Sequence, residues 1–276
     1  MIKLPDKSVP LQIYINAAGL CAPGLTGWYA SRGMLTGQIP YREDKIPPLK
    51  PLSLPPNDAR RASFNTRLAL QVAEEALAGS VVSTLACCSV FACAGGNTDA
   101  LDHVFTRLAD GERSLSPTHF INTIHNAPAG YWCLATGSTA PYTSIGAYDA
   151  SFSVGLLEAA CMAVIEQRAV LLVAYDVPPP PALLSCRPVH KPFGAALLLS
   201  ARSCRSSFCR LELTPAVAQP EDRLPDPGLE ALRMANPAAR SLPLLGALAA
   251  VRSGPVVLPY LPDSQLVVKC SSPFAL

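Results

Sequence analysis

The sequence predicts an α/β protein in which helices cover a β-sheet on both sides. Half of its 276 residues are hydrophobic, which is enough to fill a sizeable core. Apolar runs at residues 170–175 and 195–200 are typical of buried strands, and they alternate with helical patterns. The stretch Ser151–Glu166 is apolar on nearly all sides, so we expect a helix that other elements cover all round. This alternation indicates a layered architecture.

The N-terminal third predicts a strand, a proline-rich loop and a helix, at residues 11–17, 39–56 and 68–77. Gly19 and the turn after it end the strand. Asn57 or Asp58 can cap the helix, because either side chain offers an oxygen to the unpaired amides of a first turn. Gly79 stops this helix.

The rest of the chain continues the alternation. Strands are expected at residues 81–90, Tyr142–Ile145, 170–175, 195–200, 211–214 and 265–269. Helices are expected at residues 97–109, 131–136, Ser151–Glu166, 228–235 and 242–251. Residues 111–126 form an irregular connection between two of these elements.

Charge and hydropathy limit the partners that can be expected. Twenty-two basic against 20 acidic residues give a net charge of +2, without a basic block, so nucleic acid is not an expected partner. Charged residues make up 15% of the chain, against roughly 25% in ordinary globular proteins. Part of the surface is therefore expected to lie against another protein. No segment reaches the roughly 18 uninterrupted apolar residues of a membrane span, and a cytoplasmic location is expected.

The ten cysteines are scattered through apolar segments and form no CxxC pair. A chain of this length does not need a disulfide framework. The four histidines, His103, His119, His125 and His190, do not combine with the cysteines in metal-ligand spacing. We expect the cysteines to pack as small reduced side chains, and we expect no metal and no cofactor.

Residues 143–153 join a short strand to the buried helix. Asp149 stands at the start of this helix, where its carboxylate can cap unpaired amides. Ser151 and Ser153 follow it without the flanking glycines of a serine hydrolase. The run resembles the nucleophile turn of β-ketoacyl synthases, in which a cysteine opens the helix and the helix dipole favours its thiolate. The resemblance places Asp149 at the cysteine position. A carboxylate is a poor acyl acceptor there, because its mixed anhydride is more reactive than a thioester.

Four other segments resemble the same family, in the same order. They are the first strand and its turn at residues 11–23, residues 60–64 before the first long helix, the interface segment from Ser116-Pro117 to residues 126–130, and the Arg-Pro-Phe segment at residues 186–193. The resemblance covers residues 11–201. It implies a thiolase-like (ketosynthase) layered α-β-α fold with only its N-terminal half present. The implied domains are residues 1–210, including the loop at 39–56, and a short C-terminal extension at residues 211–276 packed on it.

The chain also departs from that family. Phe193 leads directly into a strand, so the acidic, glycine-rich stretch that the family carries there is missing. No histidine follows His190, whereas the family takes two catalytic histidines from a second half. The roughly 75 residues after Ser200 are too few for such a half. We therefore expect no catalytic residue and no enzymatic activity of the chain by itself.

A shortened homologue with a replaced cysteine resembles the chain-length factors, in particular those of bacterial aryl polyene clusters. The resemblance implies a subunit that heterodimerises with an active β-ketoacyl synthase and meets the acyl carrier protein through the complex. It would shape the acyl tunnel in polyene, polyketide or fatty-acid-like biosynthesis. The candidate tunnel or interface residues are Phe105, Phe120, Thr123, His125, Asn126 and Tyr131.

Two other functions stay open from the sequence. One is a malonyl-carrier-protein decarboxylase or acyltransferase in which Asp149 or His125 assists. The other is a freestanding scaffold that homodimerises through the same surface. His125 is also readily explained as a structural histidine, because no cysteine or serine nucleophile has an evident place beside it. Gly95-Gly96 before a helix favours a packing turn over a phosphate loop.

Overall fold

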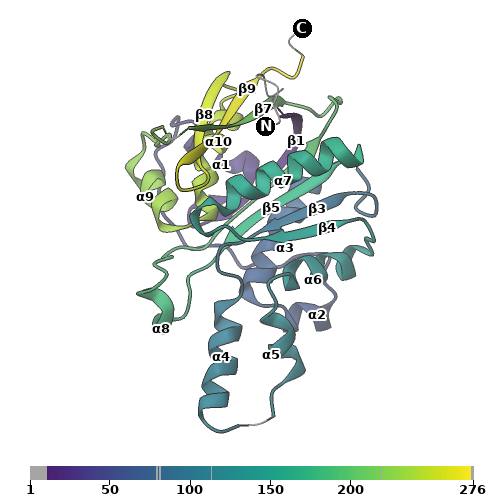
Figure 1. The fold of residues 1–276 in the computed structure, drawn as a ribbon, viewed down its shortest axis with the longest axis vertical. Helices are drawn as coiled ribbons and strands as arrows, with labels where there is room; N and C mark the ends of the chain where they lie inside the picture. The colour runs from purple at the N-terminus through teal and green to yellow at the C-terminus, as the bar shows by residue number, and fades with distance from the viewer. Residues whose placement is uncertain (1–10, 79, 81, 113, 218, 275–276) are drawn as a thin grey trace, which may run out of the picture.

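The computed structural model describes residues 11–274 apart from residues 79, 81, 113 and 218. It contains one mixed sheet with helices on both faces (Figure 1). The strands are β1 (Leu11–Ala22), β2 (Leu25–Thr26), β3 (Cys88–Ala92), β4 (Tyr142–Ile145), β5 (Val170–Asp176), β6 (Phe193–Ser200), β7 (Cys209–Val217), β8 (Gly254–Pro259) and β9 (Ser264–Ser271). The helices are α1 (Trp28–Leu35), α2 (Pro56–Arg61), α3 (Phe64–Leu77), α4 (Thr98–Ala109), α5 (Pro117–Asn122), α6 (Ala127–Thr136), α7 (Ser151–Glu166), α8 (Pro181–Leu184), α9 (Pro227–Ala235) and α10 (Leu242–Ala249), with the 3-10 turns η1 (Tyr148–Ala150) and η2 (Ala238–Ser241).

The sheet order is β4-β3-β5-β6-β1-β7-β9-β8, and β2 pairs with β1. Strands β4, β3 and β5 are parallel, whereas the remaining neighbours in the order are antiparallel. The carboxyl ends of these three parallel strands therefore lie side by side. In open α/β sheets, binding sites form at the carboxyl ends of the strands.

Helix α7 packs on one face of β3 and β5, and α3 packs on the other face of β5 and β6. Neighbouring strand residues alternate between the two layers, so Val90 lies in the core under α7 and Phe91 in the core under α3. The sheet, η1 and η2 cover one side of α7, but only eight of its 16 residues are buried and Ile165 is 76% exposed, so the expected cover on all sides was wrong. The predicted thiolase-like layered fold is confirmed.

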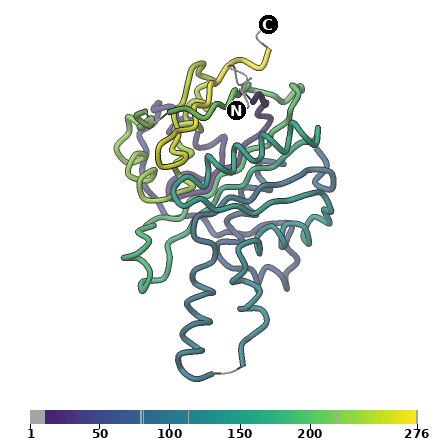
Figure 2. The backbone as a smooth tube through the Cα atoms, viewed as in Figure 1, coloured from purple at the N-terminus to yellow at the C-terminus, as the bar shows by residue number. Residues whose placement is uncertain are grey.

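Helices α4 and α5 pack against each other and extend away from the sheet as an arm (Figure 2). Asn97 caps α4 by accepting a hydrogen bond from the amide of Ala100 at 3.3 Å. The irregular connection expected at residues 111–126 contains α5, a helix of a turn and a half.

Most predicted elements are present with shifted ends, but β1 is longer than expected. It continues through Gly19 to Ala22. Gly19 is not a strand stop: a Cβ at this position would lie 2.2 Å from the backbone oxygen of Val72 in α3. The glycine lets the helix approach the strand closely.

Two other expectations were wrong. The strand expected at residues 81–90 is only Cys88–Ala92, and Leu85 before it is exposed. The long helix α3 is capped by Ser63, whose hydroxyl accepts from the amide of Thr66 at 3.1 Å. Asn57 and Asp58 belong to the separate short helix α2. The helix stop assigned to Gly79 lies outside the described residues.

The C-terminal part of the chain joins the same sheet. Strand β7 pairs with β1 over five residues, and β9 and β8 follow outwards. The boundary expected at residue 210 lies inside β7. Among the described residues, one helical stretch, Tyr148–Glu166, has the length and composition of a membrane span, and 44% of it is buried in the fold.

Candidate functional site

The turn between β4 and α7 lies at the carboxyl edge of the parallel strands. Gly146 is required there, because a Cβ would lie 2.9 Å from the backbone oxygen of Cys93 at the end of β3. Tyr148 has a φ of 52°, a left-handed conformation that strains a bulky residue. Buried Ser151 holds the turn: its hydroxyl accepts from the amide of Ala147 at 2.9 Å and donates to the oxygen of Tyr148 at 2.7 Å. The turn thus presents Asp149 in a fixed place.

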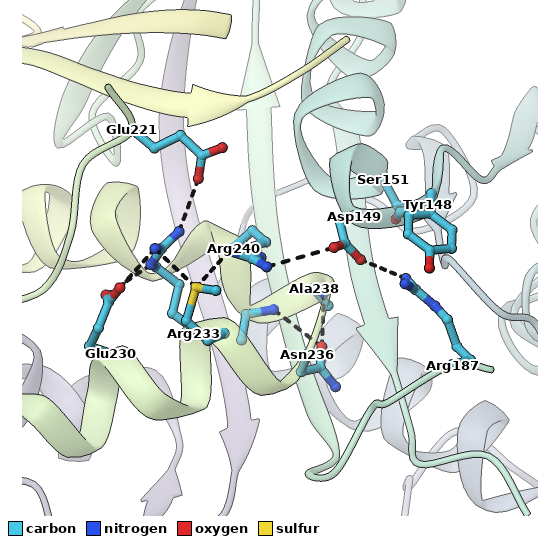
Figure 3. A network of polar contacts seen from close by, with 12 residues as sticks. Tyr148, Asp149, Ser151, Arg187, Glu221, Glu230, Arg233, Asn236, Ala238 and Arg240 are labelled. Carbon is cyan, nitrogen blue, oxygen red and sulfur yellow. Dashed lines mark hydrogen bonds and ion pairs between the residues drawn. The ribbon is translucent and has the colours of Figure 1, made fainter. Parts of the chain in front are cut away.

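Asp149 does not cap α7, and this corrects the sequence-based expectation. The helix has Ala150 at its N-cap and no side-chain cap bond. The carboxylate instead pairs with two arginines (Figure 3). Arg187 Nη2 lies 2.8 Å from Oδ1, and Arg240 Nη2 lies 3.7 Å from Oδ2. Both carboxylate oxygens face cations, so neither is poised to attack an acyl group.

The same arginine covers the neighbouring ring. The guanidinium carbon of Arg187 lies 3.6 Å from the centre of the Tyr148 ring, a cation–π contact. Arg187 belongs to the segment at residues 186–193 that the sequence singled out, but its role was not foreseen. Arg240 comes from η2, over 90 residues after Asp149, and no local pattern could have paired them.

Arg240 links Asp149 to a second charge cluster (Figure 3). Its Nη1 lies 3.0 Å from Sδ of Met234, which also accepts from Arg233 Nη2 at 3.3 Å. Arg233 is buried and pairs with Glu221 at 3.2 Å and Glu230 at 2.8 Å. These contacts compensate its charge and connect the C-terminal segment to the turn.

Beside the turn, a buried carboxyl organises the loop after β3. Asp176 Oδ1 accepts from the amides of Ala94 at 2.9 Å and Gly95 at 3.3 Å, and from the Cys93 thiol at 3.3 Å. Burial outweighs these bonds and raises the pKa of Asp176 to about 7. Burial also raises the pKa of the Cys93 thiol well above its usual range, so this cysteine is not an activated nucleophile.

His125 lies on the other side of that loop. Its Nε2 donates to the backbone oxygen of Cys93 at 3.0 Å, and its ring packs by Gly146. This is a contact of the kind a structural histidine makes, and no contact with Asp149 accompanies it among the described residues.

The other candidate residues are divided between the arm and a cleft. Phe105 on α4 and Phe120 on α5 are exposed, and the hydroxyl of Thr123 donates to the oxygen of Phe120 at 2.7 Å. Asn126 and Tyr131 line a cleft of about 310 Å³ between α2, α5 and α6. The structure does not gather the six candidates into one cavity.

The two outermost strands of the sheet, β8 and β4, differ in how their free edges are covered. At the β8 end, Pro255 and Pro259 have no amide hydrogen, and Val257 is bonded to Asp222 through both its amide and its carbonyl. That edge is sealed. At the other end, β4 pairs with β3 alone and contains no proline. Strand β4 is therefore an open edge.

Large apolar side chains are exposed on this strand and on the helices that lie between β3 and β4 in the chain. Seven of them, on α4, α5, α6, β4 and the loop after α5, are between 40% and 81% exposed: Phe105, Leu108, Phe120, Ile121, Ile124, Leu134 and Tyr142. At roughly 100 Å² each they offer roughly 700 Å² of apolar surface. That approaches the roughly 800 Å² that each partner buries in a stable protein–protein interface. We call these seven residues and the strand the β4 face.

Comparison with known proteins agrees with this geometry. The model of the β-ketoacyl synthase N-terminal domain family matches residues 37–242. No curated protein matches the chain in sequence.

Solved structures share the fold. A chain from the complex of the ketosynthase ApeO with its chain length factor ApeC, from Xenorhabdus doucetiae, is 23% identical, with a TM-score of 0.70 over 94% of this chain and 99% of that one. The ishigamide ketosynthase/chain length factor gives 12% identity and a TM-score of 0.74 over 95% and 99% of the two chains. AntDE:AntF, a type II polyketide synthase acyl carrier protein in complex with its ketosynthase, gives 12% identity and 0.71 over 95% and 99%. All three matched chains are therefore about as long as this one.

Proposed function

The chain belongs to the β-ketoacyl synthase family through its N-terminal domain, and from this premise we propose that it is a chain-length-factor-like subunit. In this proposal it performs no condensation itself. It pairs with an active β-ketoacyl synthase and shapes the acyl tunnel of that enzyme in polyene or polyketide biosynthesis. An acyl carrier protein meets the complex rather than the chain alone.

The observation that carries the proposal is the state of the nucleophile turn. In this proposal, by its resemblance to the family, the turn is the position of the catalytic cysteine, and Asp149 stands there, paired with Arg187 and Arg240. An acyl acceptor must attack the thioester and form an intermediate that is no more reactive than the thioester it replaces. A carboxylate would form a more reactive mixed anhydride, and its ion pairs with two guanidinium groups lower its nucleophilicity, so the turn supports a structural role.

The β4 face supports a protein partner. An unsealed edge strand presents free backbone amides and carbonyls, which folded proteins rarely leave open. In a parallel pair of strands, alternate residues direct their backbone amide and carbonyl to the neighbouring strand, and the residues between them direct these groups to the other side. Pro141 and Ile145 accept from β3 amides, so Tyr142 and Ser144 present their backbone groups to the open side. A strand from a ketosynthase would pair with them while the seven apolar side chains are covered.

Within that interface we assign the tunnel-limiting role to the arm. Phe105 on α4 and Phe120 on α5 are both exposed and so are free to meet a partner. A bulky ring limits an acyl chain by steric exclusion. Trimming either ring to alanine would then lengthen the products, since each additional buried methylene contributes about 0.8 kcal/mol.

Co-expression tests the proposal. Ketosynthases from the same genome that keep the cysteine at the nucleophile turn are co-expressed one at a time with the tagged chain. We expect a stable 1:1 complex by light scattering and carrier-bound polyene or polyketide products by mass spectrometry. A cooperatively melting monomer without affinity for any of these ketosynthases would contradict the proposal.

The same complex separates this function from the decarboxylase or acyltransferase alternative. Asp149→Asn removes the charge but keeps the shape of the side chain. We expect turnover of the complex within a few-fold of the unchanged protein. A loss of about 100-fold or more in an assembled complex would favour a chemical role for Asp149.

A further inference from the structure

The cleft between α2, α5 and α6 has an apolar centre and a polar rim. Ile121, Ile124 and Leu134 form its walls, and all three are exposed. Asp58 and Arg61 stand on the rim with opposite charges. Apolar centres ringed by polar groups are the usual sites at which a protein interface concentrates its binding energy.

The floor of the cleft is kept empty by Gly130. A Cβ at this position would meet nothing within 4 Å. Gly130 lies inside α6, and its amide donates to the oxygen of Asn126 at 3.0 Å as in a regular helix. A glycine inside a helix is destabilising relative to alanine, and here neither the backbone nor a close neighbour requires it. The destabilising glycine in α6 is explained if a group from another molecule fills the space in front of it.

The cleft continues into the β4 face. Asn126 on its rim donates to the hydroxyl of Tyr142 on β4 at 3.4 Å, and its three apolar wall residues all belong to that face. An occupant of the cleft would therefore be part of whatever pairs with the β4 edge. Its volume of about 310 Å³ exceeds that of any one side chain, so a bulky ring or branched chain fits with room for its backbone.

We infer that this cleft receives one bulky apolar side chain of the partner ketosynthase, flanked on the partner by a basic group opposite Asp58 and an acidic group opposite Arg61. The inference rests on the proposed pairing with a ketosynthase and names the contact that carries it. The floor at Gly130 sets the depth to which the side chain enters.

Filling the cleft from inside tests the inference. Gly130→Phe starts a side chain where a Cβ would meet nothing within 4 Å, and its ring should weaken the binding of the chain to the ketosynthase at least 100-fold, as measured by calorimetry on the purified proteins. Gly130→Ala adds one methyl group to the floor, so it should weaken binding several-fold, less than Gly130→Phe, and should melt at the same or a higher temperature. Ala30→Phe, which adds the same ring to an exposed position on α1, should leave binding unchanged.

A second variant covers the case in which Gly130→Phe does not fold. Leu134→Asp changes an 81% exposed side chain, so the fold should persist, while a charge in the wall should weaken binding at least 10-fold.

Three outcomes decide between the readings. If Gly130→Phe folds and binds as tightly as the unchanged chain, the inference is wrong although the pairing stands. If it binds normally but the complex makes shorter products, an acyl chain and not a partner side chain fills the cleft, and the inference is also wrong. If the unchanged chain binds no ketosynthase, it is the proposed function that fails.

Discussion

Asp149 links three separate segments: the turn before α7, the segment that holds Arg187, and η2, which holds Arg240. Its position follows from the sequence, because a strand, a turn and an apolar helix surround it. Its partners do not. A carboxylate before a helix fits a cap and an ion pair equally well, and Arg240 is distant in sequence. Sequence reasoning found the site and assigned the wrong contact, since capping is local and ion pairing depends on tertiary structure.

Unlike Asp149, Asp176 was not singled out from the sequence. A single aspartate at the end of an apolar strand does not indicate its hydrogen-bond partners. Its pKa is raised to about 7 from an ordinary value near 3.8 because burial penalises the charged form. The folded state therefore binds a proton over a pH range in which the unfolded chain has lost it. The contribution of this group to stability is favourable below pH 4, falls as pH rises to 7 and is then constant.

The amide variant Asp176→Asn tests this pH dependence. It keeps an oxygen for the amides of Ala94 and Gly95 but cannot ionise. The ionised carboxyl costs about 4 kcal/mol at pH 8, and an unpaired amide at the position of Oδ2 costs about 1–3 kcal/mol. We expect Asp176→Asn to be more stable than the unchanged chain by about 1–3 kcal/mol at pH 8, with little or no advantage at pH 4. Urea unfolding at both pH values measures the difference. An equal difference at the two pH values would show that Asp176 does not titrate in this range.

At the scale of elements, the apolar runs were sufficient to place α7, β5 and β6. The ends of elements depend on tertiary contacts and were less accurate. Gly19 reads as a strand stop in isolation, yet β1 continues through it because α3 approaches the strand there. The open edge at β4 could not be predicted from sequence, because it is defined by which strands lie beside it.

Proline substitutions in β4 distinguish the residues whose backbone faces the open edge from those whose backbone bonds to β3. Ser144 points its backbone outwards, so Ser144→Pro removes an amide from the open edge and leaves the hydrogen bonds to β3 intact. Thr143→Pro instead removes an amide that faces β3. We expect Ser144→Pro to melt within a few degrees of the unchanged chain but to bind the ketosynthase at least 10-fold more weakly.

Thr143→Pro should lower the melting temperature clearly, since a lost strand bond and a ring clash together cost about 3 kcal/mol. Calorimetric melting and binding assays compare the two variants. If Ser144→Pro binds normally, a strand does not pair with β4 in the complex.

At the scale of the whole molecule, residues 211–276 were expected to be a short extension packed on an N-terminal-half domain. In the structure they belong to the same sheet and the same core. Strand β7 covers the edge of β1, and α10 packs on α1. Asn236 donates to the backbone oxygen of Asp176 at 2.9 Å, and Arg240 reaches Asp149. The nucleophile turn is thus held in part by the C-terminal segment.

A chain that ends at Phe208 tests whether the N-terminal part folds alone. Its loss of β7–β9, α9 and α10 would open the edge of β1 and uncover buried side chains such as Ile13, Trp28 and Leu35. Exposing these three alone costs about 6 kcal/mol, which is comparable to the whole stability of a typical domain, about 5–15 kcal/mol. The Arg240–Asp149 pair and the Asn236 bond are lost as well. We expect the shortened chain to aggregate or to show no cooperative transition in calorimetry. The control is the full chain bound to its ketosynthase, which should melt cooperatively under the same conditions. A cooperative transition of the shortened chain would mean that residues up to 208 are an independent domain and that the C-terminal segment is an addition to it.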